Sequence, residues 1–318
     1  MLSTLLIPLD GSPLAEAALP YAEALARRSE GRLILLRAVE GAGDADADAL
    51  AEAEGYLRTL ADALVARGRE VDISAPSGDV AELIVAEGEA RNASLIVMGT
   101  HGRDGLERFF SGSIAEEVLQ RTKRPLMLVR AVGDAPAADP FPTHARVLVP
   151  LDGSIFAETA LALAHDLAGL LDGELVLLSV VTPPPPAAMG DLSLGGLPYV
   201  EFDLDEAQRE SQAYLERIAR QHGIDPATVQ ASVQTRGTAE GIVEAIGQLD
   251  AAVVVMATHA RSGLSRIFFG STATDTLHQI TVPLILLHVD DAPELVGGEG
   301  GQEAAQPVTV SPTGLTGA

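Results

Sequence analysis

The chain has 318 residues, 47 % of them hydrophobic, which is enough for about two domains with their own cores. Its 45 acidic and 21 basic residues leave a formal net charge of −24, and a chain this acidic is expected to repel nucleic acid and anionic membranes. Cysteine is absent, which excludes disulfides, thiolate metal sites and a catalytic cysteine and fits a reducing compartment.

The chain begins with a short apolar run that reads as a strand and lacks the flanks of a signal peptide. No apolar stretch reaches the roughly 18 residues that span a bilayer, so we expect a soluble, cytoplasmic protein. Strands are then predicted near residues 3–9, 33–39, 70–75, 94–98 and 126–130, and helices near 13–28, 46–67, 79–90 and 112–121. This alternation predicts a five-stranded, mostly parallel and doubly wound α/β sheet, with ligands bound beyond the carboxyl ends of its strands.

The second half of the sequence repeats these landmarks in the same order. LLIPLDGS at 5–12 returns as VLVPLDGS at 147–154, and RPLMLV at 124–129 returns as VPLILL at 282–287. The segment 94–113 likewise matches 252–271. The repeat predicts two tandem domains of the same α/β fold.

Changes in composition mark the predicted boundaries. We expect a first domain over 1–131, a Pro/Ala/Asp-rich linker over 132–144 and a second domain over 145–289. The second domain carries a proline-rich insertion at about 182–204, which is either a lid or an idle surface loop. Residues 290–318 lack periodicity and are predicted to be a disordered tail.

A glycine-rich loop follows the fourth predicted strand. Gly99 and Gly102 allow positive φ and a close backbone approach to a ligand, while Gly112 and Ser113 open the next helix, whose free amides can hold an anion. Arg103 can supply positive charge. The glycines alone fit a tight turn with an ordinary capping serine as well as they fit a phosphate-binding loop. The spacing of the two parts, Gly99 and Gly102 followed by Gly112 and Ser113, favours phosphate binding.

The pattern Gly-x2-Gly-x9-Gly-Ser from Gly99 to Ser113, the opening PLDGS at 8–12 and the closing RPLMLV at 124–129 together resemble the universal stress protein family over about 1–131 and 145–289. The resemblance implies a Rossmann-like fold of the adenine-nucleotide α-hydrolase type. It also implies that adenine, ribose and phosphates are contacted by Pro8, Leu9, Asp10, Ala38, Met98, Gly99, His101, Gly102, Arg103, Gly112, Ser113 and Ile114. Asp10 has a second interpretation as a helix cap, although Ser12 is better placed for that role.

The second copy departs from the pattern, because Ala257 and Ala260 replace the two loop glycines. If either position needs left-handed φ, alanine costs on the order of 1–2 kcal/mol there. Nucleotide binding at the second site is then weakened, altered in its preference or retained, and we favour retained binding. Its expected residues are Pro150, Leu151, Asp152, Val180, Met256, Ala257, Ala260, Arg261, Gly270, Ser271 and Thr272.

The family resemblance implies ATP as cofactor, often with Mg²⁺ carried by the phosphates, and dimerisation through the last strand. In this chain we expect the two last strands to pair as an internal pseudo-dimer, with further homodimerisation left open. The resemblance also implies an ATP-binding stress-response regulator with little or no turnover rather than an enzyme, and no catalytic residue and no protein metal site is expected. An adenylyl-transferring or ATP-hydrolysing enzyme of related fold and a nucleotide-free interaction module remain the alternatives.

Overall fold

The computed structural model describes residues 2–41, 47–100, 114–130, 139–183, 203–225, 229–233, 237–258 and 271–289. The first half of the chain, here domain 1, contains β1 Thr4–Pro8, α1 Pro13–Glu16, α2 Leu19–Ser29, β2 Arg32–Leu36, α3 Ala47–Ala66, β3 Glu70–Ser74, α4 Val80–Ala90, β4 Leu95–Thr100, α5 Ile114–Arg121 and β5 Leu126–Arg130. The second half, domain 2, contains β6 Arg146–Pro150, α6 Ile155–Glu158, α7 Ala160–Leu170, β7 Glu174–Val181, α8 Leu204–His222, β8 Val229–Val233, α9 Thr238–Leu249, β9 Ala251–Thr258, α10 Ser271–Gln279 and β10 Leu284–His288.

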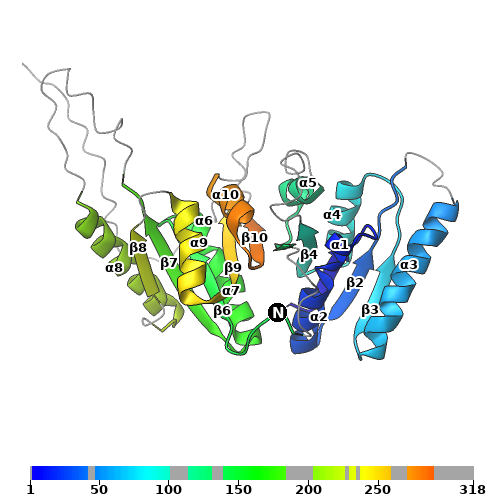
Figure 1. Ribbon diagram of the computed structural model, residues 1–318, viewed down its shortest axis with the longest axis horizontal. Coiled ribbons are helices and arrows are strands. Elements are labelled where there is room, and N and C mark those ends of the chain that lie inside the picture. The colour runs from blue at the N-terminus through cyan, green and yellow to red at the C-terminus, as the bar shows by residue number, and fades with distance from the viewer. Residues whose placement is uncertain are drawn as a thin grey trace, which may run out of the picture.

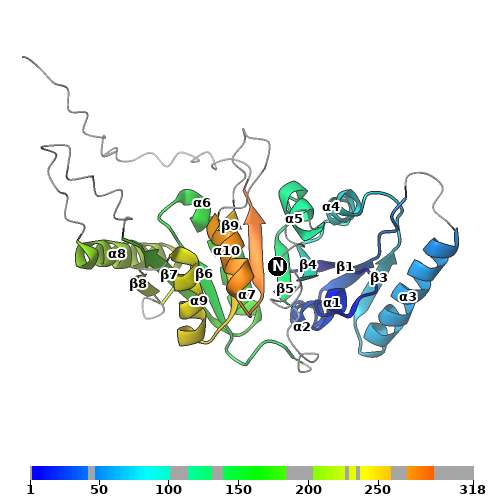
Figure 2. The ribbon, with the colours of Figure 1, turned by 45° about the horizontal axis from the view of Figure 1, so that its top comes forward.

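One sheet of ten strands runs through the described residues in the order β3-β2-β1-β4-β5-β10-β9-β6-β7-β8 (Figure 1). Neighbouring strands are parallel within each domain, whereas β5 and β10 pair antiparallel, with Met127 opposite Ile285. Figure 2 shows these two strands side by side where the domains meet. The two doubly wound domains predicted from the repeat are confirmed, and they are joined as an internal pseudo-dimer.

Helices cover both faces of the sheet, which explains why inner strands such as β1, β4 and β5 are buried along almost their whole length. On one face α1, α2, α3, α6, α7 and α8 enclose a core that includes Leu57 and Leu215 and continues across both domains. On the other face α4, α5, α9 and α10 enclose a second core that includes Ile84 and Ile242. The carboxyl ends of the strands stay uncovered by these layers and are free to carry a site.

The helix predicted over 13–28 is two helices, α1 and α2, and domain 2 repeats the break between α6 and α7. In domain 1 the break precedes Pro20, which lies in the first turn of α2 and has no backbone N–H to continue a helix. In domain 2 the hydroxyl of Thr159 donates to the Phe156 carbonyl at 2.6 Å. Both domains thus have a break at this position, which is followed by a proline in domain 1 and accompanied by a threonine hydrogen bond in domain 2.

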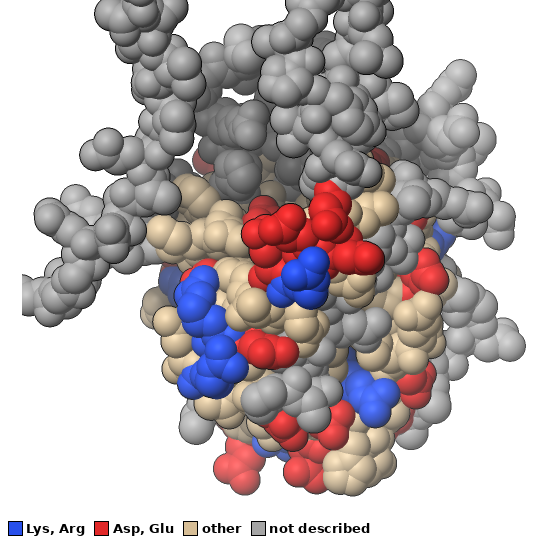
Figure 3. All heavy atoms as spheres, turned by 90° about the vertical axis from the view of Figure 1, so that its left-hand side faces the viewer, with Lys and Arg blue, Asp and Glu red and all other residues tan. Residues whose placement is uncertain are grey.

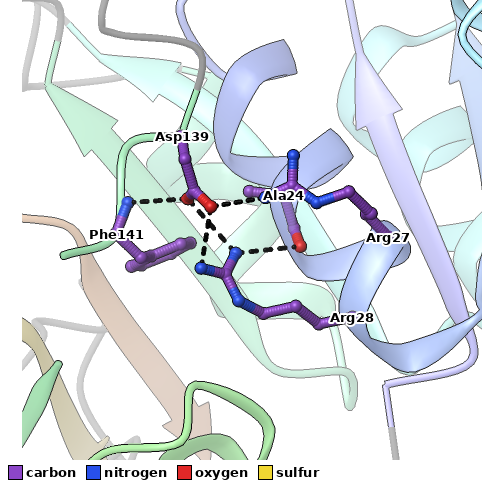
Figure 4. A network of polar contacts seen from close by, with 5 residues as sticks. All are labelled: Ala24, Arg27, Arg28, Asp139 and Phe141. Carbon is purple, nitrogen blue, oxygen red and sulfur yellow. Dashed lines mark hydrogen bonds and ion pairs between the residues drawn. The ribbon is translucent and has the colours of Figure 1, made fainter. Parts of the chain in front are cut away.

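The segment that leads into domain 2 is held against α2 through Asp139 (Figure 4). This carboxylate accepts hydrogen bonds from Arg27, from Arg28 at 2.8 Å and from the Phe141 backbone N–H at 3.1 Å. Phe141 is buried, and its ring meets the ring of Tyr21 edge-on at 5.5 Å. Burial acts to raise the pKa of Asp139, but the hydrogen bonds and the positive charge of the two arginines outweigh it, so this pKa lies below its ordinary value.

The end of the molecule that carries α8 presents a group of acidic side chains with a basic one among them (Figure 3). Four exposed carboxylates lie at the start of α8, from the N-cap Asp203 and from Asp205, Glu206 and Glu210 in its first two turns. No helix in the described ranges is both long and apolar enough to cross a membrane.

Candidate functional site

A cavity of about 630 Å³ lies in domain 1 at the carboxyl ends of β1, β2 and β4. The strands arrive there in register, since Pro8 pairs with Leu36 and the Leu9 N–H donates to the Leu36 carbonyl at 2.7 Å. The first turns of α1 and α4 and the start of α5 close the cavity. Its lining comprises Pro8, Leu9, Asp10, Leu14, Ala15, Leu36, Arg37, Ala38, Val39, Glu40, Ala49, Glu52, Val80, Ile84, Met98, Gly99, Thr100, Ile114 and Ala115.

Seven residues expected from the sequence to contact a ligand come together in this lining. They are Pro8, Leu9, Asp10, Ala38, Met98, Gly99 and Ile114. The remaining five predicted for domain 1 lie outside the described residues, namely His101, Gly102, Arg103, Gly112 and Ser113.

Asp10 shapes the turn between β1 and α1. Its Oδ1 accepts the Ser12 backbone N–H at 2.8 Å, and Gly11 takes a φ of +87°, a conformation that favours glycine. Ser12 itself is the N-cap of α1, because its hydroxyl accepts the Ala15 N–H at 3.1 Å. The cap therefore belongs to Ser12, and the exposed carboxylate of Asp10 stands at the cavity as a hydrogen-bond acceptor.

Gly99 continues β4 and is not among the glycines with positive φ, so the left-handed conformation that a glycine allows is not used at this position. Gly99 is required for a different reason. A Cβ atom there would lie 2.1 Å from the Leu14 carbonyl oxygen and 3.1 Å from the Ala15 Cα. The bare Cα thus lets the first turn of α1 rest directly on β4, which brings Leu14 and Ala15 into the cavity wall.

A polar cluster that the sequence analysis missed borders the cavity. The Arg37 guanidinium lies 5.2 Å from the centre of the Tyr56 ring and 3.3 Å from Glu52, whose side chain is 73 % exposed at the solvent edge. The Tyr56 hydroxyl donates to Glu16 at 2.8 Å. Burial and the neighbouring Glu16 carboxylate raise the Tyr56 pKa far above its ordinary value, so the hydroxyl stays a donor. Two sequence signals were available for this cluster: Arg37 directly precedes Ala38, and Glu16 and Tyr56 recur in the second copy as Glu158 and Tyr214.

Domain 2 repeats much of this geometry. Asp152 Oδ1 accepts the Ser154 N–H at 2.9 Å, Gly153 has a φ of +84°, and the Tyr214 hydroxyl donates to Glu158 at 3.0 Å. The equivalent strand ends carry the predicted residues Pro150, Val180, Met256 and Ala257 within β6, β7 and β9, and Leu151 and Asp152 directly after β6. Ser271 and Thr272 open α10. Ala260, Arg261 and Gly270 lie outside the described residues.

The domain 1 cavity combines an apolar lining with a few charged groups, as small-molecule binding sites do. Most of its lining is apolar, and its charged groups are Asp10, Arg37, Glu40 and Glu52. Within the described ranges no cluster of three or more histidine, aspartate or glutamate side chains is arranged to hold a metal ion.

Comparison with known proteins agrees with the fold and the repeat. Residues 1–130 and 144–288 each match the Universal stress protein family. The chain is 29 % identical over 272 residues to a universal stress protein of Mycobacterium tuberculosis, which covers 84 % of this chain and 81 % of the relative. It is 33 % identical over 139 residues to a universal stress protein of Thermus aquaticus, which covers 41 % of this chain and 100 % of the relative.

Among solved structures, a universal stress protein from Archaeoglobus fulgidus superimposes with a TM-score of 0.67 at 21 % identity, covering 90 % of this chain and 98 % of that one. This structural likeness supports the tandem fold. With both halves matched by the family, this chain is a member of the universal stress protein family, in a two-domain form.

Proposed function

We propose that the domain 1 cavity binds ATP and that the chain is a nucleotide-dependent stress-response regulator. The observation that carries this proposal is the convergence, in one cavity, of residues that were expected from the sequence to contact an adenine nucleotide. The cavity volume of about 630 Å³ lies in the range of small-molecule sites, and its position at the strand ends is where doubly wound sheets bind ligands.

The lining suggests how the nucleotide is oriented. Apolar side chains such as Val39 and Met98 form a surface for the base, and the Asp10 carboxylate accepts hydrogen bonds from ribose hydroxyls. With three carboxylates and one guanidinium in the lining, the phosphates are repelled from this end and directed to the amino end of α5, where the helix dipole favours anions. The Mg²⁺ that we propose to accompany ATP is carried by those phosphates.

Little or no turnover is part of the proposal. Adenylyl transfer or hydrolysis needs an acid, a base or cations positioned around the reacting phosphate. In the described lining, Arg37 is the one cation, and it is already engaged by Glu52 and Tyr56. We place this regulator in the cytoplasm, in keeping with a chain that has no cysteine.

The proposal is tested by denaturing freshly purified protein, identifying any released nucleotide by mass spectrometry, and measuring the melting temperature with and without ATP and Mg²⁺. We expect released adenine nucleotide and a rise in melting temperature, since a ligand at 100 times its Kd stabilises the folded state by about 2.7 kcal/mol. Asp10→Ala should reduce the rise, and Glu70→Ala, at the amino end of β3, should leave it unchanged.

Absence of both released nucleotide and an ATP-induced rise would contradict the proposal. Rapid consumption of ATP, or transfer of its adenylyl group, would instead favour the enzyme alternative.

A further inference from the structure

Gly99 determines how closely α1 approaches the sheet in domain 1. Its missing side chain leaves room for the Leu14 carbonyl, which would stand 2.1 Å from a Cβ atom at this position. Real Cβ atoms essentially never approach a neighbour within 3.0 Å, so a methyl group here would push α1 outward by about 1 Å. Leu14, Ala15 and the turn at Asp10 all line the cavity and depend on this approach.

Domain 2 has a methyl group at this position. Ala257 replaces Gly99 at the same place in the sheet, since Ala257 of β9 pairs with Leu287 of β10 just as Gly99 of β4 pairs with Val129 of β5. On the helix above it, Ala157 is half-buried, whereas its counterpart Ala15 is buried.

Two further wall positions are bulkier in domain 2. Phe156 stands where Leu14 lines the domain 1 cavity, and Val180 stands where Ala38 does. Both side chains are half-buried. Each adds carbon atoms at a position where domain 1 leaves space for a ligand, and packed interiors accommodate added carbons poorly.

The charged edge of the cavity also differs. Arg37, which lies between the Gly11 turn and the Tyr56 ring in domain 1, is replaced by the buried Ser179. In domain 2 the cation over the equivalent tyrosine comes instead from Arg217 of α8, 5.3 Å from the Tyr214 ring. Domain 2 thus keeps a cation over the tyrosine ring, but it lacks the guanidinium that borders the ligand space in domain 1.

We infer that the two copies are unequal sites and that the chain binds one adenine nucleotide, in domain 1. This inference rests on the proposed function and goes beyond it. Phe156, Val180 and Ala257 exclude a purine nucleotide from domain 2. The role of domain 2 is then to complete the sheet through β10. The sequence alone favoured retained binding in both copies, because alanine is the smallest replacement for glycine. The packing at Gly99 shows why even this replacement matters.

Native mass spectrometry of the full chain with ATP and Mg²⁺ tests the inference by counting bound nucleotides. Wild type should bind one. Leu14→Phe/Ala38→Val, which gives domain 1 the walls of domain 2, should weaken binding at least tenfold. Phe156→Leu/Val180→Ala/Ala257→Gly should bind a second ATP. Asp10→Ala provides an independent way to disable domain 1, and circular dichroism verifies that each variant is folded.

Two nucleotides on the wild type would overturn the inference and leave the proposed function standing. One nucleotide that binds equally well to folded Leu14→Phe/Ala38→Val and Asp10→Ala variants would overturn both the inference and the proposed domain 1 site, because it would then lie outside domain 1. A triple variant that still binds only one would contradict exclusion by these three side chains. A wild type that binds none would refute the proposed function itself.

Discussion

Replacing Gly99 with alanine should destabilise the protein. The added Cβ would lie 2.1 Å from the Leu14 carbonyl oxygen and 3.0 Å from its carbon, both backbone atoms that cannot rotate away. Overpacking of this kind costs about 1–3 kcal/mol. The alanine also restricts the unfolded chain, which returns about 0.4–1 kcal/mol. We therefore expect the free energy of unfolding to fall by about 1–2 kcal/mol.

The assay is urea unfolding followed by circular dichroism, with Gly55→Ala as the matched control. Gly55 lies in the middle of α3, is exposed and has no atom within 4 Å of its would-be Cβ. There the same substitution should stabilise the protein by about 0.5–1 kcal/mol, because alanine is the better helix former. If Gly99→Ala were as stable as wild type, the close approach of α1 to β4 would not be the reason for this glycine.

Three further predictions concern stability and are measured in the same unfolding assay. Asp139→Asn should lower the free energy of unfolding by about 0.5–1 kcal/mol at neutral pH. The pKa of the Asp139 carboxyl is depressed in the folded state, so the loss of stability should be greatest at a pH above the unfolded-state pKa of about 3.9. It should vanish as the pH falls through the folded-state pKa. A loss that does not depend on pH would refute the ion-pair explanation. Ile285→Ala, in the buried pairing of β5 with β10, should lower the free energy of unfolding by about 2–5 kcal/mol. Ile155→Ala, at an exposed position, should lower it by less than about 1 kcal/mol. Equal losses would contradict a packed junction between the domains. Tyr56→Phe and Tyr214→Phe should each cost about 1 kcal/mol, and a loss in one domain only would show that the repeated hydrogen bonds are not equivalent.

Much of the fold was predictable because it depends on patterns that repeat. The apolar runs and the motif PLDGS occur twice, and each marks a buried strand followed by a capped turn. The pairing of β5 with β10 followed from two equivalent last strands, each of which would otherwise be an exposed edge. These features depend on residues near one another in sequence or related by the repeat.

Contacts between segments that lie far apart in the sequence could not be predicted from the sequence. Gly99 was recognised as important, but its reason, the carbonyl of Leu14 on another element, appears only once α1 is placed on β4. Arg37 and Tyr56 likewise meet only after α3 packs beside β2. Tertiary packing, rather than local backbone preference, decides these positions.

The most direct test of the nucleotide site is a crystal structure of the full chain grown with saturating ATP and Mg²⁺. The account predicts density for one nucleotide in the domain 1 cavity, with its base and ribose between Ala38, Met98 and the Asp10 carboxylate. A domain 1 cavity without nucleotide under these conditions, or ATP bound elsewhere on the chain, would contradict it.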